Sequence, residues 1–399
     1  MKRIVRTGDS VFTSEERKII NDILESSRVT EYKKTDEFEK KWAETIGTKY
    51  SIAMNSGTSA LISGFYALKS IAKNEKRKKI IMPSLTFIAD ANAIVLSGLE
   101  PVFGDIDKKT FSILPSEIER ILEEQDPREF LAILPVHLMG YPCDMDKINA
   151  IAKKNNLFVF EDAAEAHGTR YNGNVVGSLG DLSCFSFYVA HNIQVGELGT
   201  VNTNNIEIKK LVKKIKAHGR VCSCDVCGRM EGKCPEVVKY KGDDDFDPRF
   251  THDMIGFNFK TTEFATALAA YRLKDIEDIN KKRRLNVSYL NEGLKKHEEI
   301  LQLPEYSEDV SYLAYPLIVK NGDKKRIRTE IEKRGVETRN LFGCIPTQQP
   351  SFSSLKGEYH GKLPNSEYIG KNGFYIGVHQ YLKKQDLDYI IKCFDEVLK

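Results

Sequence analysis

Short, continuous apolar runs alternate with amphipathic stretches from about residue 50 to residue 200. The runs resemble strands buried on both faces, and the stretches between them carry apolar residues at helical spacing. The predicted strands are 50–55, 80–83, 101–103, 131–136, 157–160 and 183–189, and the helices between them are 60–68, 88–96, 116–124 and 145–155. This alternation predicts an α/β fold with a mainly parallel sheet that helices cover on both faces.

Further helices flank this region, and a separate unit follows it. A helix starts after Thr13 or Ser14, either of which can cap it, and runs to about Leu24. The other helices are predicted at 38–46, 263–276, 279–296, 324–334 and 387–398, with strands at 312–319 and 336–339. We therefore predict a large domain over residues 1–295 and a small C-terminal α/β domain over residues 296–399.

Composition and charge narrow the class of protein. Hydrophobic residues make up 41% of the chain and charged residues 29%, as in ordinary globular proteins. The formal net charge of +3 is too small to indicate a nucleic acid or a membrane surface as a partner. No apolar run follows the N-terminal charges, and no stretch approaches the ~20 apolar residues of a membrane span. We therefore expect a cytoplasmic protein in a reducing compartment.

A polar segment at about 219–250 interrupts the core pattern, and we interpret it as an insertion. It contains four of the eight cysteines, Cys222, Cys224, Cys227 and Cys234. In a reducing compartment such a close set favours a metal site over a disulfide framework or surface thiols. Four thiolates suit structural zinc, and four thiolates also hold iron–sulfur clusters. The residues alone leave both kinds of site open.

Candidate chemistry gathers where predicted elements begin or end. Gly57 and Thr58 lie in a small-residue turn before a helix, where unpaired N–H groups and the helix dipole favour an anion. Asp162 and His191 follow strands, and Phe87 follows an earlier one. Ligands of parallel α/β folds bind at the carboxyl ends of the strands. The same turn also suits an ordinary capped helix start, so the residues alone leave the anion site open. We predict a crevice that Asp162, His191 and Phe87 face.

Five separated motifs occur in an order that resembles the vitamin B6-dependent DegT/DnrJ/EryC1/StrS sugar aminotransferase family. They occupy residues 55–61, 83–93, 135–140, 161–168 and 256–260, so the resemblance covers essentially the whole chain. It implies the aspartate aminotransferase-like fold, called fold type I. It also implies that the large domain binds the cofactor and that the protein is a homodimer with shared sites.

The resemblance assigns four residues to phosphate. Gly57 and Thr58 would hold the cofactor phosphate at the helix N-terminus, and Ser186 would add a hydroxyl. Asn258 would reach a phosphate, that of the neighbouring subunit in a dimer with shared sites.

Three further residues are assigned to the cofactor ring. Phe87 would stack on the pyridine ring, and Glu165 would lie near the ring hydroxyl or the substrate. Asp162 would pair with the protonated ring nitrogen, since a nearby carboxylate keeps that nitrogen protonated and the ring able to accept electrons.

Position 191 departs from the aminotransferases of this family, which place a lysine there. An imidazole forms no stable Schiff base, so His191 excludes covalent anchoring of pyridoxal phosphate. The surrounding cofactor motifs are intact, which favours a functional histidine over a degenerate site. The pattern resembles the histidine-containing 3-dehydratase branch, whose members bind pyridoxamine 5′-phosphate without a covalent link.

That branch implies an enzyme that removes the C3 hydroxyl from a nucleotide-linked 4-keto-6-deoxyhexose. His191 would be its base, because an imidazole with a reference pKa near ~6.5 accepts a proton at neutral pH. The non-enzymatic alternative is a sensor that kept cofactor binding and uses its cysteines as a redox or metal switch.

Within the branch, the cysteine segment resembles the iron–sulfur type, the CDP-4-keto-6-deoxyglucose 3-dehydrase. Residues 219–224 match its Gly-Arg-x-Cys-x-Cys step, although that type has a ligand at the position of Ala164 and Cys227 is extra here. The resemblance favours a [2Fe-2S] cluster that relays electrons from a reductase. A [4Fe-4S] cluster is an alternative, and so is a structural zinc in a cluster-free dehydratase that glutamate regenerates.

Overall fold

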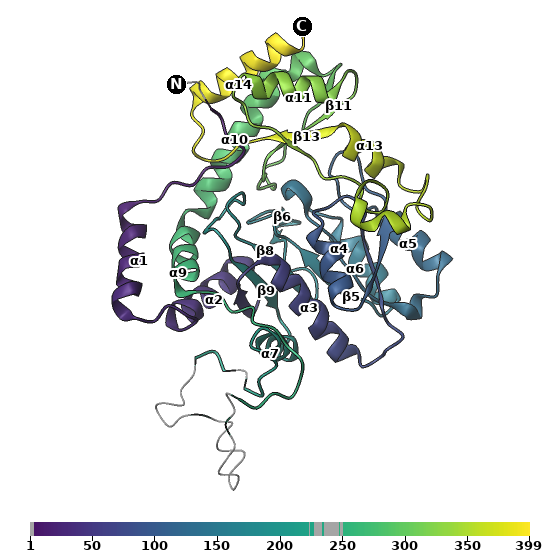
Figure 1. Cartoon of the computed structure of the whole chain (residues 1–399). Coiled ribbons are helices and arrows are strands. Elements are labelled where there is room, and N and C mark those ends of the chain that lie inside the picture. Colours follow the sequence, from purple (N-terminus) through teal and green to yellow (C-terminus); the bar gives the residue numbers. More distant parts are fainter. Residues whose placement is uncertain (1–3, 223, 227–233, 235–246, 248–249) are drawn as a thin grey trace.

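Among the residues described, a seven-stranded sheet forms the centre of the protein (Figure 1). The computed structural model describes residues 4–222, 224–226, 234, 247 and 250–399. The sheet has the order β1-β9-β8-β5-β4-β2-β3. Its strands are β1 (Tyr50–Met54), β2 (Lys79–Pro83), β3 (Glu100–Gly104), β4 (Phe130–Ile133), β5 (Phe158–Asp162), β8 (Leu182–Ser186) and β9 (Gly199–Thr203). Neighbours from β3 to β8 pair in parallel, whereas β9 is antiparallel to both β1 and β8, which confirms the predicted mainly parallel sheet.

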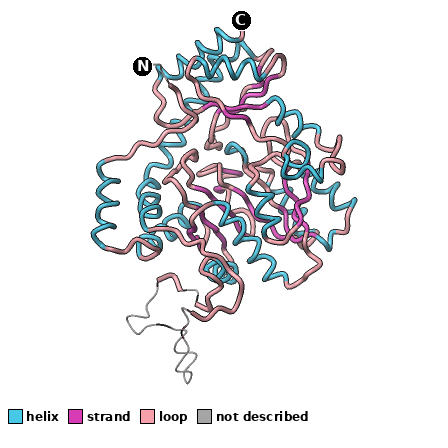
Figure 2. Tube along the Cα trace, viewed as in Figure 1, coloured by secondary structure: helices cyan, strands magenta, loops and turns pink. Residues whose placement is uncertain are grey.

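Helices cover both faces of this sheet. In β2, Ile80 and Met82 belong to one hydrophobic cluster, while Ile81 between them belongs to another. In β5, Phe160 belongs to the first of these clusters and Val159 to the second, because successive side chains of a strand point to opposite faces of the sheet. Figure 2 shows the helices around the central strands. They include α2 (Lys33–Ile46), α3 (Gly57–Ala72), α4 (Ala89–Leu96), α5 (Pro115–Glu124), α6 (Met145–Lys154) and α7 (Ile206–Ile215).

The N-terminal helix α1 (Ser14–Ser26) begins where the sequence predicts. Thr13 and Glu16 form a capping box, in which each side chain accepts a hydrogen bond from the other residue's N–H group. Glu16 also forms a buried ion pair with Arg272 of α9 (Glu263–Arg272), with 2.6 Å between Oε1 and Nε. This ion pair holds α1 against α9.

A second, antiparallel sheet lies in the C-terminal part, in the order β10-β11-β13-β12. Its strands are β10 (Leu301–Gln302), β11 (Tyr315–Val319), β12 (Arg339–Asn340) and β13 (Gly373–Ile376). The accompanying helices are α10 (Ile276–Leu294), α11 (Lys324–Lys333), α12 (Ile345–Gln348), α13 (Pro364–Asn372) and α14 (Lys384–Val397). A small hairpin of β6 (Arg170–Tyr171) and β7 (Asn174–Val175) belongs to neither sheet.

Several predicted boundaries were wrong. The helix predicted at 263–276 ends at Arg272, and a 3₁₀ turn leads from it into α10. The strand predicted at 312–319 starts only at Tyr315, because Tyr312 has a φ of 27° that no strand residue adopts. The strand predicted at 336–339 is reduced to β12 (Arg339–Asn340). The domain boundary at residue 295 falls directly after α10 and stays a prediction.

None of the helices in the described part of the chain is both long and apolar enough to cross a membrane.

Candidate active site

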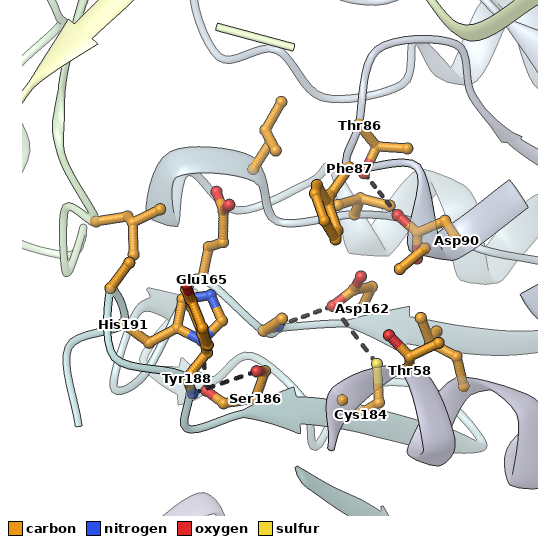
Figure 3. A pocket seen from close by; sticks show the side chains of 18 of the residues that line it. Thr58, Thr86, Phe87, Asp90, Asp162, Glu165, Cys184, Ser186, Tyr188 and His191 are labelled. Atoms are coloured by element: carbon orange, nitrogen blue, oxygen red, sulfur yellow. Dashed lines mark hydrogen bonds between the residues drawn. The ribbon is translucent and has the colours of Figure 1, made fainter. Parts of the chain in front are cut away.

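A cavity of about 490 Å³ lies where β2, β5 and β8 end (Figure 3). The first turn of α3 forms one side, and the C-terminal part contributes Leu313, Arg339, Phe342 and Tyr375. The carboxyl ends of the parallel strands meet at this edge, so side chains far apart in the sequence come together. The predicted residues that line the cavity are Gly57, Thr58, Phe87, Asp162, Glu165, Ser186 and His191.

The start of α3 is shaped to hold an anion. Ser56 caps the helix by accepting a hydrogen bond from the Ser59 N–H at 3.1 Å. A methyl group on Gly57 would lie 2.8 Å from the Ser186 β-carbon, and one on Gly199 would lie 2.6 Å from the Gly57 nitrogen. Glycines at both positions therefore let β8 and β9 approach the helix start. The backbone N–H groups there, with the hydroxyls of Thr58 and Ser186, suit a phosphate group.

The middle of the cavity presents a carboxylate and an aromatic face. Asp162 ends β5, is 7% exposed, and accepts a hydrogen bond from the Ala164 N–H at 2.8 Å. Phe87 is 55% exposed and has its ring centroid 5.7 Å from that of Phe342. A carboxylate held by a backbone donor suits a protonated ring nitrogen, and an uncovered aromatic face suits stacking on a flat ring. These groups therefore fit a pyridine cofactor.

His191 lies in the loop after β8 and not on the strand, which ends at Ser186. Its Nδ1 is 2.8 Å from the Ser186 carbonyl oxygen. A carbonyl only accepts, so Nδ1 carries the hydrogen and Nε2 keeps the basic lone pair. Burial lowers the pKa of His191 to about 4, against the opposing effects of the Ser186 carbonyl and the Asp162 charge. The imidazole is therefore a neutral base at pH 7.

Glu165 has the opposite character. It accepts a hydrogen bond from the Met139 N–H at 2.8 Å. Burial, together with the Asp162 charge, raises its pKa to about 8 against the effect of that N–H. Glu165 is therefore mainly a neutral carboxylic acid at pH 7, beside a neutral histidine.

Asn258 does not join the other predicted cofactor residues. It is exposed, pairs with Ala217 through a β-bridge, and does not line the cavity of its own chain. Its assignment to a phosphate stays a prediction that involves a second subunit.

The cysteine segment is only partly described. Cys222 and Cys234 are half-buried and Cys224 is exposed, whereas Cys227 lies outside the described residues. Within the described ranges, no three His, Cys, Asp or Glu side chains converge as metal ligands. The described residues thus do not form a metal site by themselves.

An ion-pair chain nevertheless anchors the start of this segment to the body of the protein. Asp225 pairs with Lys209 at 3.0 Å and also with the buried Lys213, which lies 3.4 Å from Glu39. Glu39 accepts a hydrogen bond from the Ala53 N–H in β1 at 2.8 Å. The first cysteines are therefore tied to the strand that leads into the anion site.

Asp90 and Tyr375 are among the cavity-lining residues that sequence reasoning missed. Asp90 had a visible signal, since an acid inside the apolar stretch 88–96 is unusual unless it has a role. Tyr375 lies on β13, a strand that was not predicted because glycines bracket its short apolar run.

Residues 11–395 match the DegT/DnrJ/EryC1/StrS aminotransferase family, and the chain belongs to this family. The match confirms the family predicted from the five motifs. The solved structures that the chain resembles confirm the aspartate aminotransferase-like fold, fold type I.

The relatives include both dehydratases and aminotransferases of sugars. The chain is 32% identical to the lipopolysaccharide biosynthesis protein RfbH of Salmonella typhimurium over 375 residues, which cover 90% of this chain and 84% of that protein. It is 31% identical to the GDP-perosamine synthase of Escherichia coli O157:H7 over 389 residues, or 96% of each chain. The structure of E. coli GDP-4-keto-6-deoxy-D-mannose-3-dehydratase with bound hydrated pyridoxal phosphate has a TM-score of 0.85 and 25% identity, covering 99% of this chain and 100% of that one. The chain therefore has the fold of enzymes that modify sugars, and its own reaction depends on the site.

Proposed function

We propose that this protein is a 3-dehydratase of a nucleotide-linked 4-keto-6-deoxyhexose that uses noncovalently bound pyridoxamine 5′-phosphate. The observation that carries the proposal is His191, which faces the cavity where the family's aminotransferases have a lysine. The relatives named for GDP-linked sugars support the substrate class.

Residues that line the cavity would contact each part of the cofactor. The start of α3 with Thr58 and Ser186 would hold its phosphate, Asp162 its ring nitrogen, and Phe87 a face of its ring. When bound, pyridoxamine phosphate supplies an amine that condenses with the sugar ketone and a ring that accepts electrons. Arg339, which lines the cavity and whose guanidinium lies 3.2 Å from Glu337, would bind the substrate's diphosphate.

His191 would move one proton twice. Its neutral Nε2 would accept the proton from the cofactor carbon that bears the amine. Its conjugate acid, with a pKa near 4, would then be strong enough to protonate the departing C3 hydroxyl. A lysine held as a Schiff base would not be free for either transfer.

The test is a product analysis of the purified enzyme with pyridoxamine phosphate and GDP-4-keto-6-deoxymannose or CDP-4-keto-6-deoxyglucose, with and without glutamate. We expect loss of the C3 oxygen and no turnover by His191→Asn, which still binds the cofactor. His360→Asn is the matched control, because His360 is exposed and outside the cavity lining. A 4-amino sugar as the main product, or full activity of His191→Asn, refutes the proposal.

A second form of the reaction adds an iron–sulfur cluster fed by a reductase, and the Cys-x-Cys-x2-Cys-x6-Cys spacing from Cys222 to Cys234 favours it. Iron and sulfide analysis of anaerobically purified protein, with its visible spectrum, tests this form. We expect Cys224→Ser to lose iron and Cys393→Ser, a buried cysteine of α14, to keep it. Colourless protein that contains zinc would exclude the iron–sulfur form and favour the dehydratase that glutamate regenerates.

The proposal includes a homodimer in which Asn258 serves the partner's cavity, since it does not reach its own. Mixing inactive His191→Asn and Asn258→Ala subunits is then expected to restore part of the activity, because one shared site regains both residues. No restoration after subunit exchange contradicts the shared site.

A further inference from the structure

Asp90 is a buried carboxyl group to which the proposed reaction gives no role. It lies in the first turn of α4, is 1% exposed and lines the cavity. Its Oδ2 accepts a hydrogen bond from the Thr86 hydroxyl at 2.6 Å. Its Oδ1 is buried and has no hydrogen-bond partner among the described residues. Burying a carboxylate oxygen that accepts no hydrogen bond costs free energy, whereas a proton on that oxygen would make it a hydrogen-bond donor. The protonation state of Asp90 therefore decides which interactions it can make.

The neighbours of Asp90 favour its neutral form. The titratable groups that face it are Asp162, Glu165 and the Cys184 thiol, and none of these is a cation. Figure 3 shows Asp90 and Asp162 as neighbours in the cavity, and the charge of Asp162 acts on Asp90. Two buried carboxylates this close do not both ionise. Burial, with the charge of Asp162, raises the pKa of Asp90 well above its usual value.

The single proton of this pair belongs to Asp90 because the two groups have different donors. The Ala164 N–H donates to Asp162 at 2.8 Å, and a backbone N–H favours the charged form of its acceptor. Among the described residues, the side chain of Asp90 has only the Thr86 hydroxyl as a donor, and a hydroxyl can also accept. A proton on Oδ1 of Asp90 turns the unpartnered oxygen into a donor toward Asp162.

We propose that Asp90 is a positioning residue, a neutral carboxylic acid whose Oδ1 donates to Asp162 and holds that carboxylate as the single anion for the cofactor's ring nitrogen. This proposal rests on the cofactor site proposed above, but not on the reaction that follows. It predicts that the site needs the hydrogen-bond donor at position 90 and not its charge.

Two variants test the proposal. Asp90→Asn keeps a neutral donor, and we expect its affinity for pyridoxamine phosphate to stay within about threefold of the wild type. Asp90→Ala removes the donor, and we expect about a tenfold or larger loss of affinity, the usual size of a hydrogen bond to a charged group. Equal losses in both variants, or no loss in Asp90→Ala, overturn the proposal.

An infrared measurement on the cofactor-free protein gives an independent readout that involves neither substrate nor turnover. We expect the wild type at pH 7 to show the C=O stretch of a protonated carboxylic acid that Asp90→Asn lacks. Glu165→Gln identifies the second such band, because Glu165 is also mainly protonated at this pH. Identical carboxylic acid bands in the wild type and Asp90→Asn overturn the proposal even where Asp90→Ala fails to fold.

Discussion

Gly199→Ala is the sharpest perturbation of the anion site. Gly199 opens β9, and a methyl group there would lie 2.6 Å from the Gly57 nitrogen and closer still to the Ser56 carbonyl. Nonbonded heavy atoms with a carbon partner settle at about 3.5–4.0 Å, so the two backbones must part by about 1 Å. The three nearest atoms belong to the main chain, so no side-chain rotation moves them out of the way.

This displacement has two calculable costs. Overpacking of this kind destabilises a protein by about 1–3 kcal/mol. It would also move the N–H groups of α3 out of line with a phosphate bound there as proposed, and each hydrogen bond to a charged group is worth about 1.5–3 kcal/mol. We therefore expect the affinity for pyridoxamine phosphate to fall by about 10- to 100-fold.

The assay is cofactor titration by fluorescence, with urea denaturation of the cofactor-free protein in parallel. Gly357→Ala is the matched control, because a methyl group at Gly357 meets no atom within 4 Å. Affinity within about threefold of the wild type, with unchanged stability, would refute the reasoning that a tight β9–α3 contact builds the anion site.

Three further predictions concern the cavity residues. His191→Lys is expected to form a borohydride-reducible Schiff base with pyridoxal phosphate. Val189→Lys is the control and should form none, because Val189 is exposed and lies outside the cavity lining. Absence of the adduct in His191→Lys means that residue 191 does not face the cofactor. Because the folded-state pKa of His191 is lowered from 6.5 to about 4, the unfolded chain binds the extra proton between these values, and stability falls as the pH falls. His191→Asn should remove up to about 3 kcal/mol of this decline in urea titrations from pH 7 to 4, and an unchanged slope contradicts the shift. The pKa of Glu165 is raised from 4.5 to about 8, so its contribution to stability is full below pH 4.5 and is lost as the pH rises to 8. Glu165→Gln should flatten this decline, and a slope like that of the wild type argues against a neutral Glu165 in the folded protein.

Sequence patterns predicted the mainly parallel sheet well because its strands are continuous apolar runs with long helices between them. β2 and β5 fall within two residues of the predicted ranges, and the cavity sits at the sheet edge expected for them. The C-terminal sheet was harder, since β12 and β10 span two residues each and have no periodicity to detect. The side of the cavity formed by Tyr375 and Phe342 was therefore missed, because β13 was not predicted and Phe342 follows the two residues of β12.

The chemical state of His191 depends on the folded structure as well as on the residue type. The sequence identified the residue and its departure from lysine, but a histidine on a strand end is equally able to be charged, in the wrong tautomer, or turned away. Three facts of the fold decide otherwise: the Ser186 carbonyl holds the hydrogen on Nδ1, burial keeps the ring neutral, and the loop after β8 brings it to the cavity. Each depends on contacts made only when β5, β8 and the loop are assembled. The proposed base therefore depends on the folded loop, and substitutions that free the ring from the Ser186 carbonyl should impair the proposed activity without changing His191.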